Sequence, residues 1–442
     1  MISDIGFLSV HGRIKAVKIS VLSAYRLIKT QSPYLYPDNQ KSMEGLIRRQ
    51  KYTDAVEPFA WNGNAKVITG IRRCGKSSLL ELIRNGFDSE VNVIHINTEF
   101  REYSEIRDWK IFLDLVDSGY RENVKNVLIV DEIQNIDGWE LAVRDIIAKK
   151  KFDIYLTGSN SNLLSSEYAT HLGGRYNSIR MLPLSYRECV EFATAFGLDG
   201  DVLERYVRLG GFPINWISDV PVHSALQTVS DIADVIISVD INRRFNVRNP
   251  SLLNDIFRTI LSMTGSYVSS NKIYNTLKSS GFRTSVDTVN EYIKYLETAN
   301  LLIRADVYDL KGRRILENKR KYYAADLSLK HAILGYRPED IPGHLENIVF
   351  TELLYRGYDV YVGDYNGKEI DIVAEKTGER MYVQCCTSIS NDDTMKREFG
   401  NLEHLDDSFP KYVVMMDPGP YRGITDKGII CCGLREFLEE NV

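Results

Sequence analysis

Short apolar runs alternate with helix-like stretches between residues 65 and 182. The five runs that read as strands are Ala65–Thr69, Val91–Asn97, Asn126–Val130, Phe152–Thr157 and Ser178–Leu182. Helical stretches separate most of them, and the first is Ser77–Asn85. Strands that alternate with helices are typical of a parallel sheet covered on both faces. The pattern therefore predicts an α/β unit over residues 43–188.

The pattern becomes mainly helical after Pro183. Tyr186–Phe196, Leu203–Leu209 and residues 222–242 read as helices, and Gly210-Gly211-Phe212-Pro213 interrupts them. The next elements follow the order of a winged helix-turn-helix, with helices Leu252–Met263, Asn271–Ser279 and Ser285–Ala299 and strands Leu301–Tyr308 and Lys319–Ala324. We therefore expect a helical and winged-helix region over residues 189–325.

A second α/β pattern occupies residues 326–442. Its predicted elements are helix His344–Tyr355, strands Asp359–Val362, Glu369–Glu375 and Met381–Cys386, a helix near Met395–Leu405, and strand Tyr412–Met416. At the other end, residues 1–42 read as a flexible or weakly helical extension. Because Met43 opens the globular pattern, an optional leader is an alternative interpretation of residues 1–42.

Composition restricts the class of protein. Of the 442 residues, 44% are hydrophobic and 26% are charged, as in an ordinary globular protein. The net charge of -5 means that any basic surface is local. No apolar run approaches the roughly 18 residues that span a bilayer, and the N-terminus does not read as a secretory signal. The six cysteines form no Cys-x-x-Cys pair, which predicts reduced thiols and a cytoplasmic location.

A phosphate-binding motif follows the first predicted strand. The segment from Gly70 to Ser77 matches G-x-x-x-x-G-K-[ST] at every fixed position and opens a helix. Its glycines permit close backbone approach, and the N–H groups at the helix start attract phosphate. Lys76 supplies a charge for the β/γ phosphates, and Ser77 supplies a hydroxyl for Mg²⁺. The motif predicts ATP and Mg²⁺ binding by Gly70, Ile71, Arg72, Arg73, Cys74, Gly75, Lys76, Ser77 and Ser78.

Three side chains of this loop have two interpretations each. Arg72 and Arg73 either contact phosphate or face solvent. Cys74 either has a thiol pKa lowered by backbone N–H groups or is a small filler residue. The filler interpretation of Cys74 is favoured.

Two carboxylates end the third predicted strand. Asp131 and Glu132 follow the apolar run Val127–Val130, which we expect to lie beside the strand of the phosphate loop. Asp131 is then suited to Mg²⁺, and Glu132 is suited to polarising the attacking water. The alternative is a pair of solvated loop acids, which the phosphate loop disfavours.

Polar residues after the fourth strand and a later arginine complete the predicted site. Ser159 or Asn160 can contact the γ-phosphate or the water, and Asn160 carries the prediction. A helix N-cap is the other role for this position, and the two roles are compatible. Arg175 is predicted to stabilise γ-phosphate charge, either in cis or from a neighbouring subunit of a homo-oligomer. A surface arginine is the alternative.

Several segments together resemble a family of prokaryotic AAA-type ATPases that carry a C-terminal domain of unknown function. They are Ile71–Ser77, Leu128–Gln134 with Trp139, Thr157–Leu164, Gly174–Tyr176, Pro183–Glu188, Gly210–Pro213, Tyr323–Asp326, Glu346–Val349 and Glu369–Asp371. The resemblance covers the chain from about residue 44. It implies an ATP site, a winged-helix middle and a nuclease-like tail.

The order of elements in the tail resembles the PD-(D/E)XK nuclease fold. That fold places an acid on a helix, an Asp on one strand and a Glu-x-Lys on the next. Glu346 and Asp371 match, but Gln384 stands in the place of the second strand acid and Cys386 in the place of the lysine. An amide binds Mg²⁺ more weakly than a carboxylate, and the missing lysine removes a stabilising charge. We therefore predict an inactive tail kept for binding or assembly, although Lys368 is a conceivable substitute.

A basic cluster marks the tip of the predicted wing. It consists of Lys311-Gly312-Arg313-Arg314 and Lys319-Arg320-Lys321. Contact with DNA phosphates is one interpretation, and a solvated tip or a lid on the ATPase core is the favoured one.

Three functional hypotheses follow from the sequence. The first is a Mg²⁺-dependent ATPase whose hydrolysis moves the winged-helix and nuclease-like domains. The alternatives are an ATP-controlled DNA-processing nuclease and a nucleotide-gated scaffold with little turnover. No membrane partner is expected.

Overall fold

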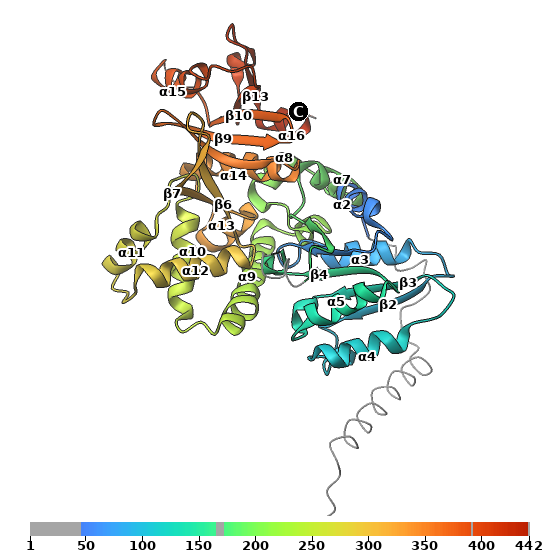
Figure 1. The fold of residues 1–442 in the computed structure, drawn as a ribbon. Helices are drawn as coiled ribbons and strands as arrows, with labels where there is room; N and C mark the ends of the chain where they lie inside the picture. The colour runs from blue at the N-terminus through green and yellow to red at the C-terminus, as the bar shows by residue number, and fades with distance from the viewer. Residues whose placement is uncertain (1–45, 165–171, 390–391, 441–442) are drawn as a thin grey trace, which may run out of the picture. The chain divides into compact units, whose positions relative to one another are not determined.

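Five parallel strands form the first sheet, in the order β2-β3-β4-β1-β5. Figure 1 labels β2, β3 and β4 of this sheet. Their bounds are β1 Ala65–Thr69, β2 Asn92–Asn97, β3 Asn126–Asp131, β4 Asp153–Gly158 and β5 Tyr176–Arg180. Every residue of β1, β3 and β4 is buried, because both faces of the sheet are covered. The predicted α/β fold with a parallel sheet is confirmed, and each strand lies within two residues of its expected bounds.

The strand order differs from the expected one at the centre of the sheet. β4 pairs with β1 on one side and with β3 on the other. The strand that ends in Asp131 is therefore not the neighbour of the phosphate-loop strand, and that expectation is wrong. The apolar pattern of a strand does not indicate which strand lies next to it. As a result, the end of β4 lies between the phosphate loop and the acids.

The computed structural model describes residues 46–164, 172–389 and 392–440, so the predicted extension at residues 1–42 lies outside the described residues. From Arg49 onward the described chain forms one unit. The helices of its first part are α2 Gln50–Val56, α3 Lys76–Asn85, α4 Trp109–Gly119 and α5 Trp139–Lys149, with short 3₁₀ turns at Glu57–Phe59, Arg101–Tyr103, Ile133–Asn135 and Ser161–Leu164. α3 packs on β3 and β4, while α4 packs on α5.

A helical region follows the sheet. Its helices are α7 Tyr186–Phe196, α8 Val202–Leu209, α9 Val222–Val235, α10 Pro250–Ser262, α11 Ser270–Ser279 and α12 Val286–Thr298, with a 3₁₀ turn at Pro213–Trp216. The helix expected over residues 222–242 is present, but its second part, Ile236–Arg243, is a π-helix labelled η6. Such π-helical turns are rare in proteins, and those that occur are often found at functional sites.

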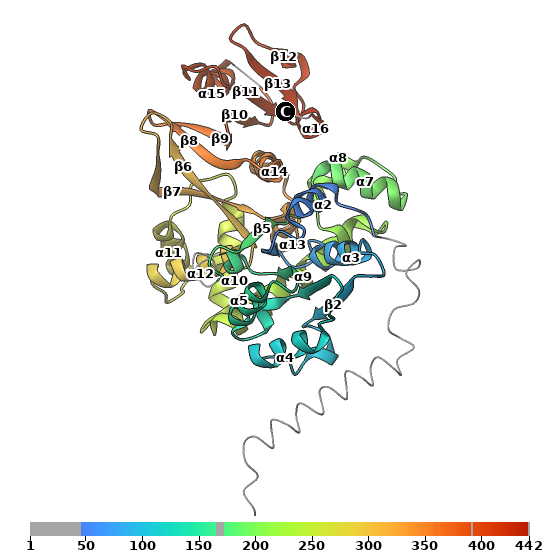
Figure 2. The same cartoon turned by 45° about the vertical axis from the view of Figure 1, so that its right-hand side comes forward.

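Strands β6 (Leu302–Asp309) and β7 (Arg314–Ala324) form the antiparallel hairpin that the sequence predicts. β6 also pairs in parallel with β8, so the hairpin is one end of an eight-stranded sheet (Figure 2). That sheet has the order β12-β13-β11-β10-β9-β8-β6-β7. The winged-helix assignment and the division between residues 325 and 326 remain predictions.

The tail supplies the other strands of this sheet. They are β8 Asp359–Tyr365, β9 Lys368–Lys376, β10 Glu379–Cys386, β11 Lys411–Met415, β12 Gly423–Ile424 and β13 Ile429–Gly433. Its helices are α13 Leu327–Leu334, α14 Ile341–Tyr355, α15 Asp392–Glu403 and α16 Leu434–Glu439, with 3₁₀ turns at Pro338–Asp340 and Gly419–Tyr421. The helix–strand succession from α14 to β11 is the predicted one. Across the described residues, no helix combines the length and apolar character needed to cross a membrane.

Candidate nucleotide site

The turn between β1 and α3 has the shape of a phosphate cradle. α3 begins at Lys76, directly after Gly75, whose φ of 105° is unfavourable for residues with a side chain. Among the residues that the structure describes, no side chain caps the N-terminus of α3, so its first N–H groups are available to an anion. A Cβ on Gly70 would collide with the carbonyl oxygen of Met181. These residues fit a bound nucleotide phosphate.

The Lys76 ammonium lies at the centre of the site and is buried. It donates to the carbonyl oxygens of Gly70 at 3.0 Å and Ile71 at 3.2 Å. Its Nζ is also 3.8 Å from Oε1 of Glu132. The lysine is thereby aimed along the phosphate loop and toward the predicted water-polarising acid.

Asp131 is buried at the end of β3 and meets several polar groups. It accepts hydrogen bonds from the hydroxyls of Thr157 and Ser77 and, at 3.1 Å, from Nδ2 of Asn97. Burial raises the pKa of Asp131 above its usual range, although the bonds from Thr157 and Ser77 oppose the shift. The two predicted Mg²⁺ ligands, Ser77 and Asp131, are therefore in direct contact.

Glu132 adopts a left-handed backbone with φ of 54°, and its Oε1 lies 3.8 Å from Nζ of Lys76. Its carboxylate accepts hydrogen bonds from the Gln134 amide and, at 3.2 Å, from the N–H of Ser159. Burial by itself raises the pKa of Glu132, but the charge of Lys76 and the Gln134 bond outweigh burial and lower it. Glu132 is thus held ionised, as a residue that polarises water requires.

The guanidinium of Arg72 is engaged by two acids. Its Nε and Nη2 each donate to the Asp240 carboxylate at 3.1 Å, and its Nη1 donates to Glu99 at 2.7 Å. All three guanidinium nitrogens are therefore paired with acids, and one of these acids, Asp240, lies on the π-helix η6. Arg73 is exposed, with a left-handed φ of 68°.

Cys74 is fully buried, and its sulfur faces the carbonyl oxygen of Met181 at 3.6 Å. Burial raises the pKa of its thiol, so a thiol pKa lowered by the loop is not what the structure shows. The favoured interpretation as a filler residue agrees with this environment.

The buried Arg49 supports the phosphate loop from behind, and sequence reasoning missed it. Its Nη1 donates to the carbonyl oxygens of Cys74 at 3.0 Å and Leu182 at 2.9 Å. Its Nε and Nη2 bind the Glu188 carboxylate at 2.8 and 2.6 Å. Because Arg48 and Arg49 stand in a polar segment, nothing local distinguishes the buried one.

The loop after β4 has the expected place, but Arg175 does not. Ser159 and Asn160 are both buried at the same sheet edge as the acids. Arg175 is exposed, and its carbonyl accepts from the N–H of Ala65 at the start of β1. β1 separates it from the phosphate loop by roughly 15 Å. The prediction that Arg175 acts in cis is therefore wrong, and a role from a neighbouring subunit remains a prediction.

Three further polar residues of the site were not predicted. Asn97 ends β2, Thr157 is the residue before the last of β4, and Gln134 follows the acid pair. Each is a polar residue at or just after the carboxyl end of a buried strand, which is the signal that also identified Asp131. The strand order supplied the missing information, because it brings Thr157 next to Asp131.

The tail has its own acidic cluster, and Lys321 lies inside it. The Lys321 ammonium is 1% exposed and lies 2.8 Å from Glu346 and 2.7 Å from Glu369. The hydroxyl of Tyr323 also donates to Glu346 at 2.5 Å. The prediction that Lys321 belongs to an exposed basic tip is wrong. The basic run does not indicate that Lys321 is buried, because the acids that enclose it come from α14 and β9.

The two nuclease-type strand positions contact each other. The Asp371 carboxylate accepts from the N–H of Cys385 at 2.8 Å, and the Asp371 N–H donates to Gln384 at 3.2 Å. Burial and the neighbouring Glu346 raise the pKa of Asp371 well above its usual range. Lys368 approaches His404 at 3.4 Å on the surface. Nowhere in the described ranges do three or more His, Cys, Asp or Glu residues gather as a metal site.

The remaining charges of the hairpin tip are partly paired. Arg314 lies 3.7 Å from Asp309, and Lys319 lies 3.5 Å from Asp364. Lys311 and Arg313 are exposed in the turn between β6 and β7. The basic character of the tip is therefore weaker than the sequence alone indicated.

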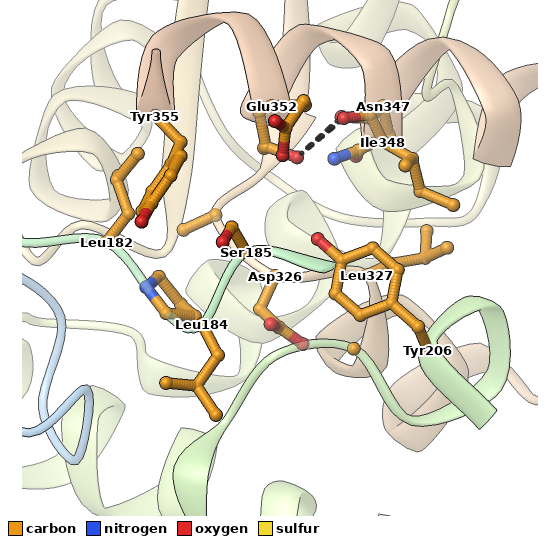
Figure 3. Close-up of a pocket in the computed structure, with 14 residues that line it drawn as sticks. Leu182, Leu184, Ser185, Tyr206, Asp326, Leu327, Asn347, Ile348, Glu352 and Tyr355 are labelled. Carbon is orange, nitrogen blue, oxygen red and sulfur yellow. Dashed lines mark hydrogen bonds between the residues drawn. The ribbon is translucent and has the colours of Figure 1, made fainter. Parts of the chain in front are cut away.

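A pocket lies between α14 and the segment after β5, apart from the phosphate loop. Asn347, Glu352 and Tyr355 line it from α14, while the Asp326 carboxylate is directed away from α14, toward the turn at Gly210 and Gly211 (Figure 3). Asp326 accepts from the N–H of Gly211 at 2.6 Å and from the N–H of Ser328 at 2.9 Å. The carboxylate of Asp326 is thus engaged in fastening the Gly210–Pro213 turn.

The AAA domain family matches residues 62–190, the part of the chain that contains the cradle and the acid pair. This part is an AAA-type P-loop ATPase domain. A domain of unknown function matches residues 200–340.

Among relatives, an uncharacterized protein of Haemophilus influenzae is 35% identical over 383 residues, which cover 84% of this chain and 94% of the relative. The chain belongs to the family of that protein. An uncharacterized protein of Methanocaldococcus jannaschii is 28% identical over 361 residues, covering 76% of this chain and 78% of the relative.

Similar solved structures include the Walker-type ATPase of Pyrococcus abyssi. It has 17% identity and a TM-score of 0.44, with coverage of 68% of this chain and 98% of that chain. The RuvB Holliday junction branch migration motor of Thermotoga maritima has 19% identity and a TM-score of 0.32, with coverage of 62% and 92%.

Proposed function

We propose that the protein is a Mg²⁺-dependent ATPase whose hydrolysis cycle moves the helical and nuclease-like regions. The observation that carries the proposal is the convergence of Lys76, Ser77, Asp131 and Glu132 at one sheet edge. Lys76 and Ser77 begin the helix that follows β1, and Asp131 and Glu132 lie at and just after the end of β3, a strand that does not adjoin β1.

Phosphate binding falls to the loop and to Lys76. The open N-terminus of α3 and the ammonium of Lys76 supply donors and positive charge for the β and γ phosphates. Arg49 keeps the Cys74 carbonyl turned to the back of the loop. Arg72 is paired with Asp240 and Glu99, so we assign it to anchoring the loop, although it was first predicted to bind nucleotide.

Ser77 and Asp131 are the residues that would hold Mg²⁺, which when bound neutralises phosphate charge. Two oxygen ligands are few for this ion, which usually completes its shell with water and substrate phosphate. Glu132, held ionised by Lys76, orients and polarises the attacking water. Ser159 and Gln134 fix the direction of its carboxylate, and Asn160 follows as the predicted contact for the γ-phosphate end.

The helical region is placed to respond to this chemistry. Asp240 on η6 is bound to the phosphate loop through Arg72, and α12 contacts the segment after β4. The tail contacts the same unit through α16, whose Arg435 donates to Tyr186 on α7 at 2.8 Å. Hydrogen bonds therefore connect the nucleotide edge to later parts of the chain and can couple their movements.

For the tail, we propose a nuclease-like fold used for binding or assembly. Lys321 and Tyr323 already neutralise and bind Glu346, the helix acid that a nuclease would give to its metal. Gln384 and Cys386 add no charge. Incubation of the protein with plasmid, Mg²⁺ or Mn²⁺ and ATP is the test, and cleavage that disappears in Asp371→Ala would overturn this assignment.

Phosphate release from ATP by the purified chain, with and without DNA, tests the proposed function. We expect Mg²⁺-dependent hydrolysis by the unmodified chain and none above background in Lys76→Ala. Stimulation by DNA would favour the DNA-processing alternative and a role for the exposed Lys311 and Arg313. ATP binding with no hydrolysis in either condition would instead support the nucleotide-gated scaffold and refute the ATPase.

A further inference from the structure

Asn300 follows the C-terminus of α12 and reaches the nucleotide edge of the first sheet. The residue is 4% exposed and has a left-handed φ of 56°, a conformation that asparagine tolerates better than most residues. Its Nδ2 donates to the carbonyl oxygen of Ser159 at 3.2 Å. Ending a helix explains the backbone conformation but not this buried hydrogen bond to a residue 141 positions earlier.

Ser159 is the residue that orients Glu132. Its N–H donates to the Glu132 carboxylate at 3.2 Å, and its Oγ accepts from Gln134 at 3.3 Å. Asn300 holds the carbonyl on the other side of the same residue. Only Ser159 therefore lies between the Asn300 amide and the carboxylate that polarises the water.

A second bond fastens the same segment to the same helix end. The hydroxyl of Ser161 donates to the carbonyl oxygen of Thr298 at 3.0 Å. Thr298 is the last residue of α12, so the two bonds join the loop after β4 to one turn of the chain. Paired bonds of this kind fix a position and an orientation, which a single bond does not.

We infer that Asn300 is a positioning residue for ATP hydrolysis, which keeps the Ser159 N–H aimed at Glu132. The inference rests on the proposed function and adds to it a dependence of the rate on the docking of α12. Misplacement of a reacting group by about 1 Å is enough to slow a reaction about 100-fold. A ligand or partner that draws the α12–β6 turn away from the sheet would slow hydrolysis without touching the phosphate loop.

Two substitutions isolate the amide. Asn300→Asp retains the size and the tolerance of a left-handed φ but loses the donor when ionised. Asn300→Gly retains the backbone conformation and removes the side chain. Asn246→Asp is the matched control, because Asn246 also has a left-handed φ, of 49°, in the helical region and is exposed. Glu132→Gln is the reference for loss of the water-polarising group.

For each variant of the purified chain, we would measure the Kd for Mg²⁺–ATP, the kcat for hydrolysis and the midpoint of thermal unfolding. We expect kcat to fall about 10–100-fold in both Asn300 variants, as for other residues that orient a catalytic group. The Kd should stay within about twofold, because the cradle and Lys76 are unchanged. Asn246→Asp should leave all three quantities unchanged.

Two results would overturn the inference alone. One is an unchanged kcat in both Asn300 variants while Glu132→Gln is slow. The other is a parallel loss of kcat, ATP affinity and unfolding midpoint, which would mark a purely structural residue. If Glu132→Gln hydrolyses ATP at the unmodified rate, or the unmodified chain hydrolyses none, the proposed function fails and this inference fails with it.

Discussion

The nucleotide edge and the tail cluster each contain a buried lysine and carboxylates, but the two lysines differ in how closely the acids surround them. At the nucleotide edge, Lys76 is 3.8 Å from Glu132 and otherwise binds loop carbonyls. In the tail, Lys321 lies within 2.8 Å of two carboxylates, those of Glu346 and Glu369. The first lysine faces an open cradle of N–H groups, and the second is almost completely enclosed by its acids.

The difference shows how a carboxylate and a lysine acquire a function. An ion pair that satisfies itself in a buried place contributes to structure and has little left for a ligand. Lys76 donates to neutral loop carbonyls beside the N-terminus of α3, so its charge can still pair with a phosphate. We therefore expect substitution of Lys76 to affect ATP binding and substitution of Lys321 to affect folding.

The largest effect is expected from Lys76→Met. Loss of the ammonium should weaken ATP binding about 100-fold or more, because a charged donor to phosphate is removed. The free energy of unfolding should fall by only about 1 kcal/mol, since the lost bonds are to loop carbonyls. Calorimetric titration with Mg²⁺–ATP and urea unfolding measure the two quantities. ATP binding at the unmodified affinity would contradict the assigned role of the lysine.

The tail lysine should give the reverse result. Lys321→Met leaves Glu346 buried without its cation, so the free energy of unfolding should fall by about 3–5 kcal/mol. The Kd for ATP should not change. The double variant Lys321→Met/Glu346→Gln removes the uncompensated charge and should recover part of the loss. Equal stability of the single variant and the unmodified chain would show that the cluster is not a closed ion pair.

A smaller effect is expected where the helical region meets the phosphate loop. Asp240→Asn removes one charge from the bidentate pair with Arg72, at a cost of about 1–3 kcal/mol of stability. If Arg72 anchors the loop, Arg72→Gln should cost about the same and shift the ATP Kd much less than Lys76→Met does. A loss of affinity in Arg72→Gln as large as that in Lys76→Met would return Arg72 to the phosphate ligands.

The smallest effect is expected at the hairpin tip. Arg314→Ala and Lys319→Ala each break an exposed pair, and each should change the unfolding free energy by less than about 1 kcal/mol. Thermal unfolding in low and in high salt measures this, because screening should remove what little difference exists. A loss comparable with that of Lys321→Met would mean that the tip, too, is part of a buried network.

Local patterns were sufficient for the elements and for the first residues of the site. The bounds of β1 follow from a short apolar run, and the phosphate motif predicts a helix from Ser77, one residue after the observed start of α3. Asp131 and Glu132 follow from acids at the end of a buried strand. These inferences need only residues that are near one another in the chain.

Contacts between distant segments were beyond the sequence. The place of β4 between β1 and β3, and with it the role of Thr157, depends on strand order. The prediction for Arg175 failed because β5 runs parallel to β1. Arg175 precedes β5 and therefore lies at the edge of the sheet opposite the phosphate loop. Lys321 looked exposed in a basic run, yet the opposing acids come from β9 and α14. Asn300 had no local signal beyond a helix end.

Hydrolysis by Glu132→Gln tests the central claim most directly. The substitution keeps the size of the side chain and removes the charge that Lys76 holds in place. We predict that the variant binds Mg²⁺–ATP with the Kd of the unmodified chain and hydrolyses it about 100-fold more slowly, or slower still. Hydrolysis by Glu132→Gln at the unmodified rate would contradict the account.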